Sequence, residues 1–228
     1  MLEWHRILEN LRSTDDVDFE EACGALDQAA DESRLPDLYR LLTEKENFCA
    51  REAAVVPVVR LAGLRALPQL LDALRLGEQE GHDNDGPAAL VADLVQESPA
   101  EAAPVLLTML RAEDPARRAH AAWLLGFAIP AATVEPLVTA LSADRSAEVR
   151  AAAAGALSSF EGSEDATNSL VRALDDAAEQ VRISAASSLG YLGDVRAVPR
   201  LRVALEDPAA GVRASAKYAL EQLQRHVT

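Results

Sequence analysis

Residues 149–157 read VRAAAAGAL, residues 181–189 read VRISAASSL, and residues 212–220 read VRASAKYAL. The arginines of these segments, Arg150, Arg182 and Arg213, are 32 and 31 residues apart, and a further step of 32 leads back to Arg118 in RRAHAAWLL. A period of this length is typical of stacked supersecondary units, none of which can bury its apolar face alone. The sequence therefore predicts a repeat array with a core shared between neighbouring units.

A second signal repeats with the same period. Leucine-rich stretches follow prolines at five positions, namely Pro36, Pro68, Pro104, Pro136 and Pro199. Their spacings are 32, 36, 32 and 63, and the last is two periods with Asn168 in the skipped position. The spacing of 36 places about four extra residues in the glycine-rich, acidic stretch 77–86. We expect a loop insertion there, because insertions in repeat arrays fall on one face, which is often the binding face.

The two signals predict an all-α chain in which two classes of helix alternate. Helices with the arginine signal are expected at 47–63, 86–96, 115–128, 146–160, 178–192 and 209–226, and those with the proline signal at 66–76, 100–111, 132–142, 164–174 and 195–205. Residues 1–46 are less regular and predict an N-terminal helical cap, with helices near 1–12, 17–30 and 35–43. Residues 47–228 form the repeats, continuous with the cap as one domain, because terminal repeats of such arrays are usually atypical.

The pattern D-x-x-x-x-V-R-x-x-A-x-x-x-L, followed by a turn and P-x-L-x-x-x-L, resembles HEAT-like repeats of the short type named after phycobilisome lyases. The stretches 189–194 and 207–213 are close matches. The resemblance implies an α-solenoid, a right-handed superhelix of antiparallel helix pairs whose arginine helices line the concave side. It also implies that Arg118, Arg150, Arg182 and Arg213 form a structural ladder with aspartates of neighbouring repeats.

The resemblance leaves the function open, since this family includes chromophore lyases, hydroxylases, glycosylases, adaptors and inhibitors. Hydroxylase-type sites use His-Glu dipeptides, and none of the four histidines here precedes a glutamate. The lyase type is neither affirmed nor excluded by any residue. A nucleophile–base pair, a phosphate-binding glycine loop or a pair of catalytic carboxylates cannot be identified either. We therefore expect no enzyme activity, no cofactor and no metal, while a lyase-type activity on a chromophore or other small molecule stays the alternative.

The charge is strongly acidic and unevenly distributed. The formal net charge is −15, of which residues 1–114 carry −14 and residues 115–228 carry −1. Such a surface disfavours nucleic acid and attracts a basic protein partner, although an acidic surface that only keeps the protein soluble is the plainer interpretation. The two cysteines indicate neither a disulfide framework nor a zinc site. With no secretory signal and no charge-free membrane-spanning stretch in the sequence, we expect a cytoplasmic monomer that contacts no membrane.

Two groups of residues are candidates for the protein-binding surface. The first is the predicted loop, with Glu78, Glu80, His82, Asp83 and Asp85, whose charges we expect to support no core. His82, Asp83 and Asp85 could also hold a metal, but a flexible glycine-flanked loop is poorly preorganised for ligation, so a solvated or partner-contacting loop is favoured.

The second group follows from helix geometry. Counted from the arginine, positions −1, +3, +7 and +10 predict a buried stripe, and positions +1, +5 and +8 lie on the opposite side. The opposite side holds mostly small residues, with the large side chains Trp123, Ile183 and Tyr218 among them. Trp123 and Tyr218 are therefore candidate contact anchors, although Trp123 could instead pack within its own array. The function that we expect is a non-catalytic scaffold or inhibitor, for example an immunity protein that neutralises a basic toxin.

Overall fold

The described chain is helical throughout, with no strand among the residues that the structure describes. The structure, a computed structural model, describes residues 3–13, 15–45, 47–129 and 131–227. It divides into two compact units, unit 1 (Met1–Glu97) and unit 2 (Ser98–Thr228). The all-α solenoid predicted from the repeat is confirmed, whereas a right-handed superhelix over the whole chain stays a prediction.

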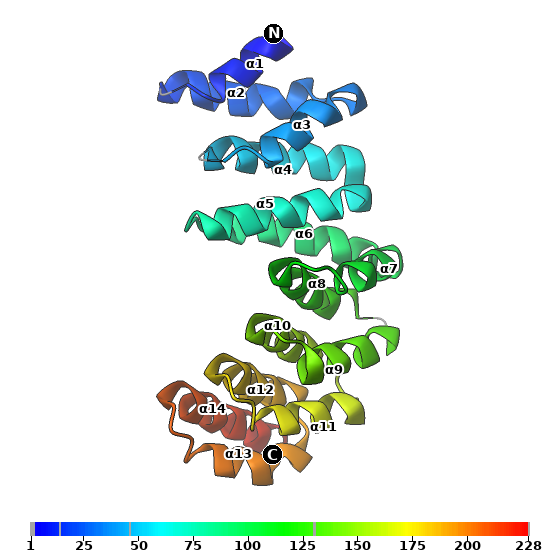
Figure 1. Cartoon of the computed structure of the whole chain (residues 1–228), viewed down its shortest axis with the longest axis vertical. Coiled ribbons are helices and arrows are strands. Elements are labelled where there is room, and N and C mark those ends of the chain that lie inside the picture. Colours follow the sequence, from blue (N-terminus) through cyan, green and yellow to red (C-terminus); the bar gives the residue numbers. More distant parts are fainter. Residues whose placement is uncertain (1–2, 14, 46, 130, 228) are drawn as a thin grey trace. The chain divides into compact units, whose positions relative to one another are not determined.

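Unit 1 is built from three antiparallel helix pairs. Its helices are α1 (Trp4–Asn10), α2 (Asp16–Ala29), α3 (Leu35–Leu42), α4 (Phe48–Ala62), α5 (Leu67–Gln79) and α6 (Asp85–Glu97), with the short 3-10 helices η1 (Glu32–Arg34) and η2 (Gly63–Ala66). The even-numbered helices form one row, in which α2 packs on α4 and α4 on α6, and α3 packs on α5 in the other row (Figure 1). The predicted cap and the first regular repeats therefore belong to the same unit.

Unit 2 contains four helix pairs. The odd-numbered row is α7 (Pro99–Met109), α9 (Val134–Ala143), α11 (Glu164–Ala173) and α13 (Val198–Ala204), and the even-numbered row is α8 (Pro115–Ala128), α10 (Ala147–Leu157), α12 (Glu179–Leu192) and α14 (Ala210–Val227). The 3-10 helices η3 (Ala131–Thr133) and η4 (Val195–Ala197) precede α9 and α13. The even-numbered helices contact one another in sequence order, as the green-to-red row of Figure 1 shows.

The core lies where the sequence period places it. Val149, Ala153 and Leu157 of α10 and the equivalent Val181, Ala185 and Leu189 of α12 are all 0% exposed. The stripe at positions −1, +3, +7 and +10 is therefore confirmed. Alanine and leucine carry this core because small side chains allow helices to approach closely, and leucine fills the remaining space.

The starts and ends of the helices follow local chemistry. Asp15, Asp114 and Ser163 accept hydrogen bonds from backbone N–H groups in the first turns of α2, α8 and α11, which satisfies donors that lack intrahelical partners. Proline occupies the first or second position of several helices, where its missing N–H has no consequence. Gly63 ends α4 with a φ of 53°, a left-handed conformation that favours glycine.

The predicted insertion is shorter than expected. Helix α5 continues through Gly77 to Gln79, and α6 begins at Asp85, so only five residues separate the two helices. Most of the extra residues lengthen α5 by about one turn instead of forming a long loop. A glycine within a helix is tolerated at a modest loss of stability, and this is why its presence misled the sequence-based prediction.

One segment of unit 1 is apolar enough to meet the length and composition of a membrane span. It runs from Phe48 to Gln79, through α4, η2 and α5, and half of its apolar window is buried inside the protein. Its buried residues include Val58, Leu70 and Leu71, each at most 1% exposed. Core helices of repeat arrays satisfy the same criterion because both of their sides are covered.

Candidate functional site

A ladder of arginine–aspartate pairs connects successive repeats of unit 2. In each step the Nε and Nη2 atoms of an arginine donate to both carboxylate oxygens of the aspartate in the next repeat, and the donor–acceptor distances are 2.7–3.0 Å. The pairs are Arg118–Asp144, Arg150–Asp176 and Arg182–Asp207. Their side chains are only 11–17% exposed. Bidentate pairs of this kind are geometrically specific and stronger than neutral hydrogen bonds.

The same arginines also bind the backbone of their own repeat. The Nη1 atom of Arg150 donates to the carbonyl oxygen of Asp144 at 2.9 Å, and that of Arg182 to the carbonyl oxygen of Asp176 at 2.9 Å. Hydrogen bonds from Arg150 lower the pKa of Asp176, although partial burial opposes the effect. Arg118, Arg150 and Arg182 thus each bind an aspartate of the next repeat. Among the described residues Arg213 binds only the carbonyl oxygens of Asp207 and Pro208, so the predicted pairing with an aspartate of a neighbouring repeat is not observed there.

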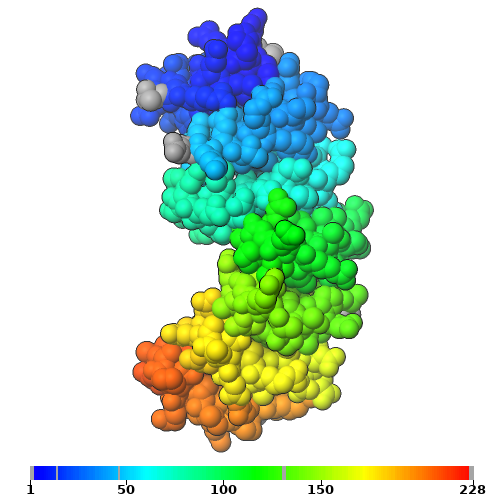
Figure 2. All heavy atoms as spheres, in the orientation of Figure 1, coloured from blue at the N-terminus to red at the C-terminus, as the bar shows by residue number. Residues whose placement is uncertain are grey.

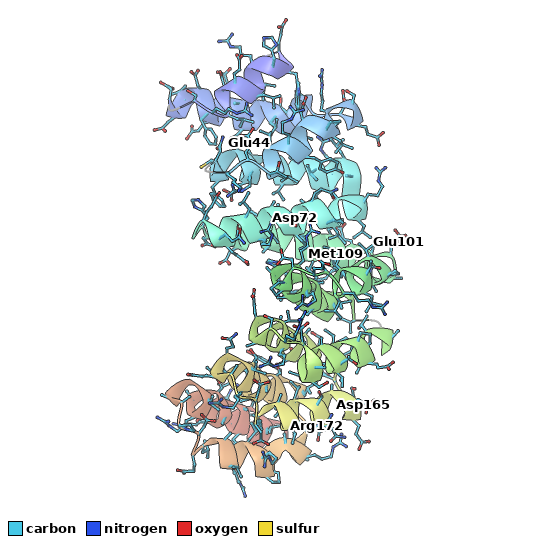
Figure 3. The ribbon with its side chains drawn as sticks, in the orientation of Figure 1. Glu44, Asp72, Glu101, Met109, Asp165 and Arg172 are labelled. Atoms are coloured by element: carbon cyan, nitrogen blue, oxygen red, sulfur yellow. The ribbon has the colours of Figure 1, made fainter. Side chains whose placement is uncertain are left out.

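Unit 1 contains an equivalent of this ladder that the sequence did not reveal. Arg51, 2% exposed, donates through Nη1 to the carbonyl oxygen of Glu44 and through Nη2 to the carboxylate of Glu80. Glu44 lies in the turn between α3 and α4, where Figure 3 labels it, and also accepts a hydrogen bond from Arg12. A signal was available, because Arg51 lies 67 residues before Arg118, which is one step of 31 plus the step of 36 that contains the insertion.

This pairing changes the interpretation of the predicted loop. The Glu80 carboxylate is 19% exposed and bound to Arg51, so the expectation that the loop charges support no core is wrong for Glu80. His82 stacks on Phe48, with ring centroids 4.3 Å apart and an interplanar angle of 15°. The side chain of Asn84 donates to the carbonyl oxygen of Leu74 and closes the end of α5.

The remaining loop residues lie at the surface. Glu78, Asp83 and Asp85 are exposed, and one carboxylate oxygen of Asp83 accepts a hydrogen bond from the backbone N–H of Asp85. Their part in binding a partner stays a prediction. Among the described residues, no group of three or more His, Cys, Asp or Glu side chains is placed to hold a metal ion.

At position +8 the small-residue side of the arginine helices is covered, whereas Gly155 at position +5 is exposed. A Cβ added to Gly126 of α8 would lie 3.0 Å from Cα of Ala156 on α10, and one added to Gly190 of α12 would lie 2.8 Å from Cα of Ala219 on α14. Position +8 therefore lies in the contact between successive even-numbered helices. The small residues there permit close helix approach, and they do not form a partner surface.

The two predicted aromatic anchors have different environments. Trp123 is half-buried and contacts Phe127 of the same helix edge-to-face, with ring centroids 5.2 Å apart. Tyr218 is 43% exposed and lies beside Tyr191, which is 60% exposed, with ring centroids 6.4 Å apart. Exposed tyrosines are common binding anchors, so Tyr218, with Tyr191 beside it, stays a candidate contact residue. Part of the Trp123 ring packs on Phe127 and is not available to a partner.

The even-numbered row of unit 1 carries a surface that the sequence did not single out. Its exposed carboxylates include Glu20 on α2, Glu52 on α4, and Asp85 and Asp93 on α6, and we name these four the acidic face. A Cβ added to Gly86 would lie 3.6 Å from Oε1 of Glu52, so this carboxylate reaches the start of α6, next to Asp85. Among the described residues, none of the four has an ion-pair partner, while Asp27 on α2 pairs with Arg60.

A half-buried thiol lies close to two carboxylates of the acidic face. The pKa of Cys23 is raised, first by burial, then by Cys49, and further by the carboxylates of Glu52 and Glu20. Cys23 therefore lies between acidic side chains of neighbouring helices α2 and α4. In the sequence, Asp85, Ala89 and Asp93 follow one another at intervals of four residues, which predicts that they lie on one side of a helix. Only the packing of α2, α4 and α6 brings the carboxylates of the three helices together.

These observations define the class of protein: an α-solenoid in which stacked helix pairs are connected by partly buried arginine–aspartate ion pairs. The chain belongs to the family of HEAT repeats, whose model matches residues 103–190 and 170–227. No curated protein sequence matches the chain.

Three solved structures show the same fold at low sequence identity. The complex of CpcE and CpcF of the phycocyanin lyase from Nostoc sp. PCC7120 is 24% identical, with a TM-score of 0.54, and the match covers 69% of this chain and 99% of that one. Human deoxyhypusine hydroxylase in complex with glycerol is 22% identical, with a TM-score of 0.51 over 96% of this chain and 84% of the enzyme. A designed armadillo repeat protein in complex with the peptide (KR)4 is 18% identical, with a TM-score of 0.50 over 97% and 100%.

Proposed function

We propose that this protein is a non-catalytic binding scaffold whose acidic face engages a basic segment of another protein. The observation that carries the proposal is the set of four unpaired carboxylates, Glu20, Glu52, Asp85 and Asp93, on adjacent helices of one row. Charge of one sign on a rigid surface raises the association rate of an oppositely charged partner. The proposal includes a cytoplasmic location, a monomeric state and no contact with nucleic acid or membrane.

The structure of unit 1 suits this role because its carboxylates are held by a packed scaffold. Glu52 lies on α4, whose neighbouring side chains Ala54 and Val58 are fully buried. A side chain on such a helix has a fixed backbone position before the partner arrives, so less conformational freedom is lost on binding. Val56, 45% exposed on the same helix, adds an apolar contact next to the charges. An immunity protein that masks a basic toxin or nuclease is one concrete form of this function.

A basic peptide tests the proposal without knowledge of the natural partner. A suitable probe is an octapeptide of alternating lysine and arginine, which is the ligand of the designed armadillo neighbour, and its binding is measured by fluorescence anisotropy at several salt concentrations. Replacing Glu20, Glu52 and Asp93 by their amides should weaken binding about tenfold or more, because each exposed charge pair contributes about 0.5 kcal/mol. The salt dependence should also become shallower.

The matched control removes the same number of charges from unit 2. The control variant combines Glu148→Gln, Glu161→Gln and Glu206→Gln, and all three carboxylates are exposed and lie in unit 2. This control variant should weaken binding by less than about threefold, since only the long-range field changes. Equal weakening by both triple variants would show that the peptide responds to net charge alone and would contradict a defined acidic face.

The alternative function is a lyase-type activity on a chromophore. Its support is the fold similarity to the CpcE–CpcF complex of phycocyanin lyase, at 24% identity. Titration of the purified protein with a bilin distinguishes the two proposals. A saturable change in the visible absorption of the bilin would favour the lyase type, and an unchanged spectrum together with peptide binding would favour the scaffold.

A further inference from the structure

The even-numbered helices of unit 2 share one side that carries aromatic rings and almost no charge. Counted from the ladder arginine of each repeat, positions −2, +2, +5 and +9 lie within about 60° of one another around a helix and point away from the buried stripe. On α8, α10, α12 and α14 these positions hold a single charged residue, Glu148, although 26% of the chain is charged. We name this side of the four helices the aromatic face.

Aromatic rings lie at both ends of the aromatic face. On α8, Trp123 and Phe127 occupy positions +5 and +9, are half-buried, and have ring centroids 5.2 Å apart. On the last two helices, Tyr191 of α12 at position +9 and Tyr218 of α14 at position +5 are 60% and 43% exposed, with ring centroids 6.4 Å apart. Atoms of α14, coloured orange, lie at the surface of unit 2 in Figure 2. Because α8 packs on α10, α10 on α12 and α12 on α14, both pairs of rings belong to one continuous row of helices.

Small residues of α10 and α12 separate the two pairs of rings. Gly155 and Ser159 of α10 are exposed at positions +5 and +9, and Ser187 of α12 is half-buried at position +5. A Cβ added to Gly155 would have no atom within 4 Å, so the space above α10 is open. Two helix spacings, roughly 16–20 Å, separate α8 from α12. The aromatic face is therefore an open strip of small residues with aromatic rings at both ends.

The indole N–H group of Trp123 is a hydrogen-bond donor that has no acceptor among the described residues. The tryptophan of unit 1, Trp4, donates from Nε1 to a carboxylate oxygen of Asp37 at 2.8 Å. Trp123 makes no such bond within the described chain, and its Nε1 atom is accessible to solvent. An indole N–H can only donate, so the group that it binds in a partner is an acceptor such as a carbonyl oxygen.

We infer that the aromatic face binds a proline-rich segment of another protein, whose rings pack on Trp123, Tyr191 and Tyr218 and one of whose carbonyl oxygens accepts a hydrogen bond from Trp123. A segment in the polyproline II conformation has no internal hydrogen bonds, exposes its carbonyl oxygens, and docks on surfaces lined by aromatic side chains. At about 3.1 Å per residue, about six residues span the distance between the two pairs of rings. An uncharged segment suits this face, since a charged one would lose water there without gaining a partner. The site lies in unit 2 and does not depend on the acidic face or on the function proposed above.

The test uses the whole protein and blocked decaproline, with a blocked decapeptide of alternating glycine and serine as the uncharged control. In ¹H–¹⁵N NMR spectra the two indole N–H signals are assigned by their loss in Trp4→Phe and Trp123→Phe. Decaproline should shift the Trp123 signal in a saturable way. The Trp4 signal should stay in place, because its N–H group is already bound to Asp37. The glycine–serine peptide should move neither signal, since it has no proline rings and no preformed polyproline II conformation.

Matched variants distinguish this site from weak binding elsewhere on the surface. Gly155→Gln places a long side chain on the open strip, and Gly24→Gln makes the same change on α2 of unit 1. Both glycines are exposed helix residues at which an added Cβ has no atom within 4 Å, so both variants should fold. Gly155→Gln should weaken decaproline binding about tenfold or more, and Gly24→Gln should change it less than about twofold. Tyr218→Ser introduces the residue found at the equivalent position of α12, Ser187, and should weaken binding about threefold. A thermal melt of each variant checks that the fold is retained.

The other outcomes overturn the inference. Equal binding of the glycine–serine peptide, equal effects of Gly155→Gln and Gly24→Gln, or no binding of decaproline at about millimolar concentration would each show that the aromatic face is not a proline-binding surface. Self-association of the protein that Gly155→Gln abolishes would show that the occupant is a second copy of this chain. A bilin that shifts the Trp123 signal where decaproline does not would assign the aromatic face to the alternative, lyase-type function.

Discussion

Replacing Arg150 by methionine removes one step of the ladder and keeps much of the aliphatic side chain. The guanidinium makes two hydrogen bonds of 2.7 and 2.8 Å to Asp176 and one of 2.9 Å to the carbonyl oxygen of Asp144. A hydrogen bond to a charged group contributes about 1.5–3 kcal/mol when it is well shielded. The pair here is 14–17% exposed, so water replaces part of the loss. We expect the free energy of unfolding to fall by about 2–4 kcal/mol.

The matched control is Arg213→Met. Arg213 makes the same type of bond to backbone carbonyl oxygens but has no aspartate partner among the described residues. Its replacement should lower the free energy of unfolding by only about 0.5–1 kcal/mol. The difference between the two variants, about 2–3 kcal/mol, measures the bond between one repeat and the next.

The assay is denaturant unfolding followed by circular dichroism, with the midpoint and the slope compared together because a repeat array can unfold in more than one step. Acid provides a second check. Since Arg150 lowers the pKa of Asp176 below its ordinary 3.8, the native state keeps a charge that the unfolded chain loses as the pH falls. The stabilisation is complete above about pH 5 and is lost as the pH falls below about 4, so the two variants should converge in acid. Equal midpoints for Arg150→Met and Arg213→Met at pH 7 would refute the ladder as a source of stability.

Three further predictions concern packing and charge. Gly190→Ala should lower the free energy of unfolding by about 1–3 kcal/mol, because the added Cβ would meet the backbone of the next helix. Gly155→Ala should raise the free energy of unfolding by about 0.5–1 kcal/mol, because no atom lies within 4 Å of the added Cβ and alanine favours the helix. Thermal denaturation compares the two variants. Leu157→Ala and Leu189→Ala should each lower the free energy of unfolding by about 2–5 kcal/mol in denaturant titrations, since both side chains are 0% exposed, and losses below 1 kcal/mol would contradict the helix register. Asp194, whose pKa hydrogen bonding lowers from 3.8 to about 2, should contribute about 1–2 kcal/mol above pH 4 that is lost between pH 4 and 2, so Asp194→Asn should reduce the acid sensitivity of unfolding.

The sequence alone determined the repeat, the helix class and the buried stripe. Two signals with one period locate the helices to within a few residues, and positions such as Leu157 and Leu189 follow from the 3.6-residue turn. Arg150 and Arg182 were also identifiable as structural, because the same residue recurs once per unit. These features are local or periodic, so each is encoded within one repeat and confirmed by its copies.

Only the tertiary structure decided which surfaces are free. In the sequence, Gly126 and Gly190 cannot be distinguished from small residues on an exposed face, because small residues occur both at the surface and in close helix contacts. The structure shows that the next helix covers both of them. The sequence predicted that Glu80 is a solvated loop charge, whereas in the structure its carboxylate accepts a hydrogen bond from Arg51, 29 residues away in the sequence. A one-dimensional pattern reports which side of a helix is apolar, whereas contacts between repeats determine which polar groups are already satisfied and which are free to bind a partner.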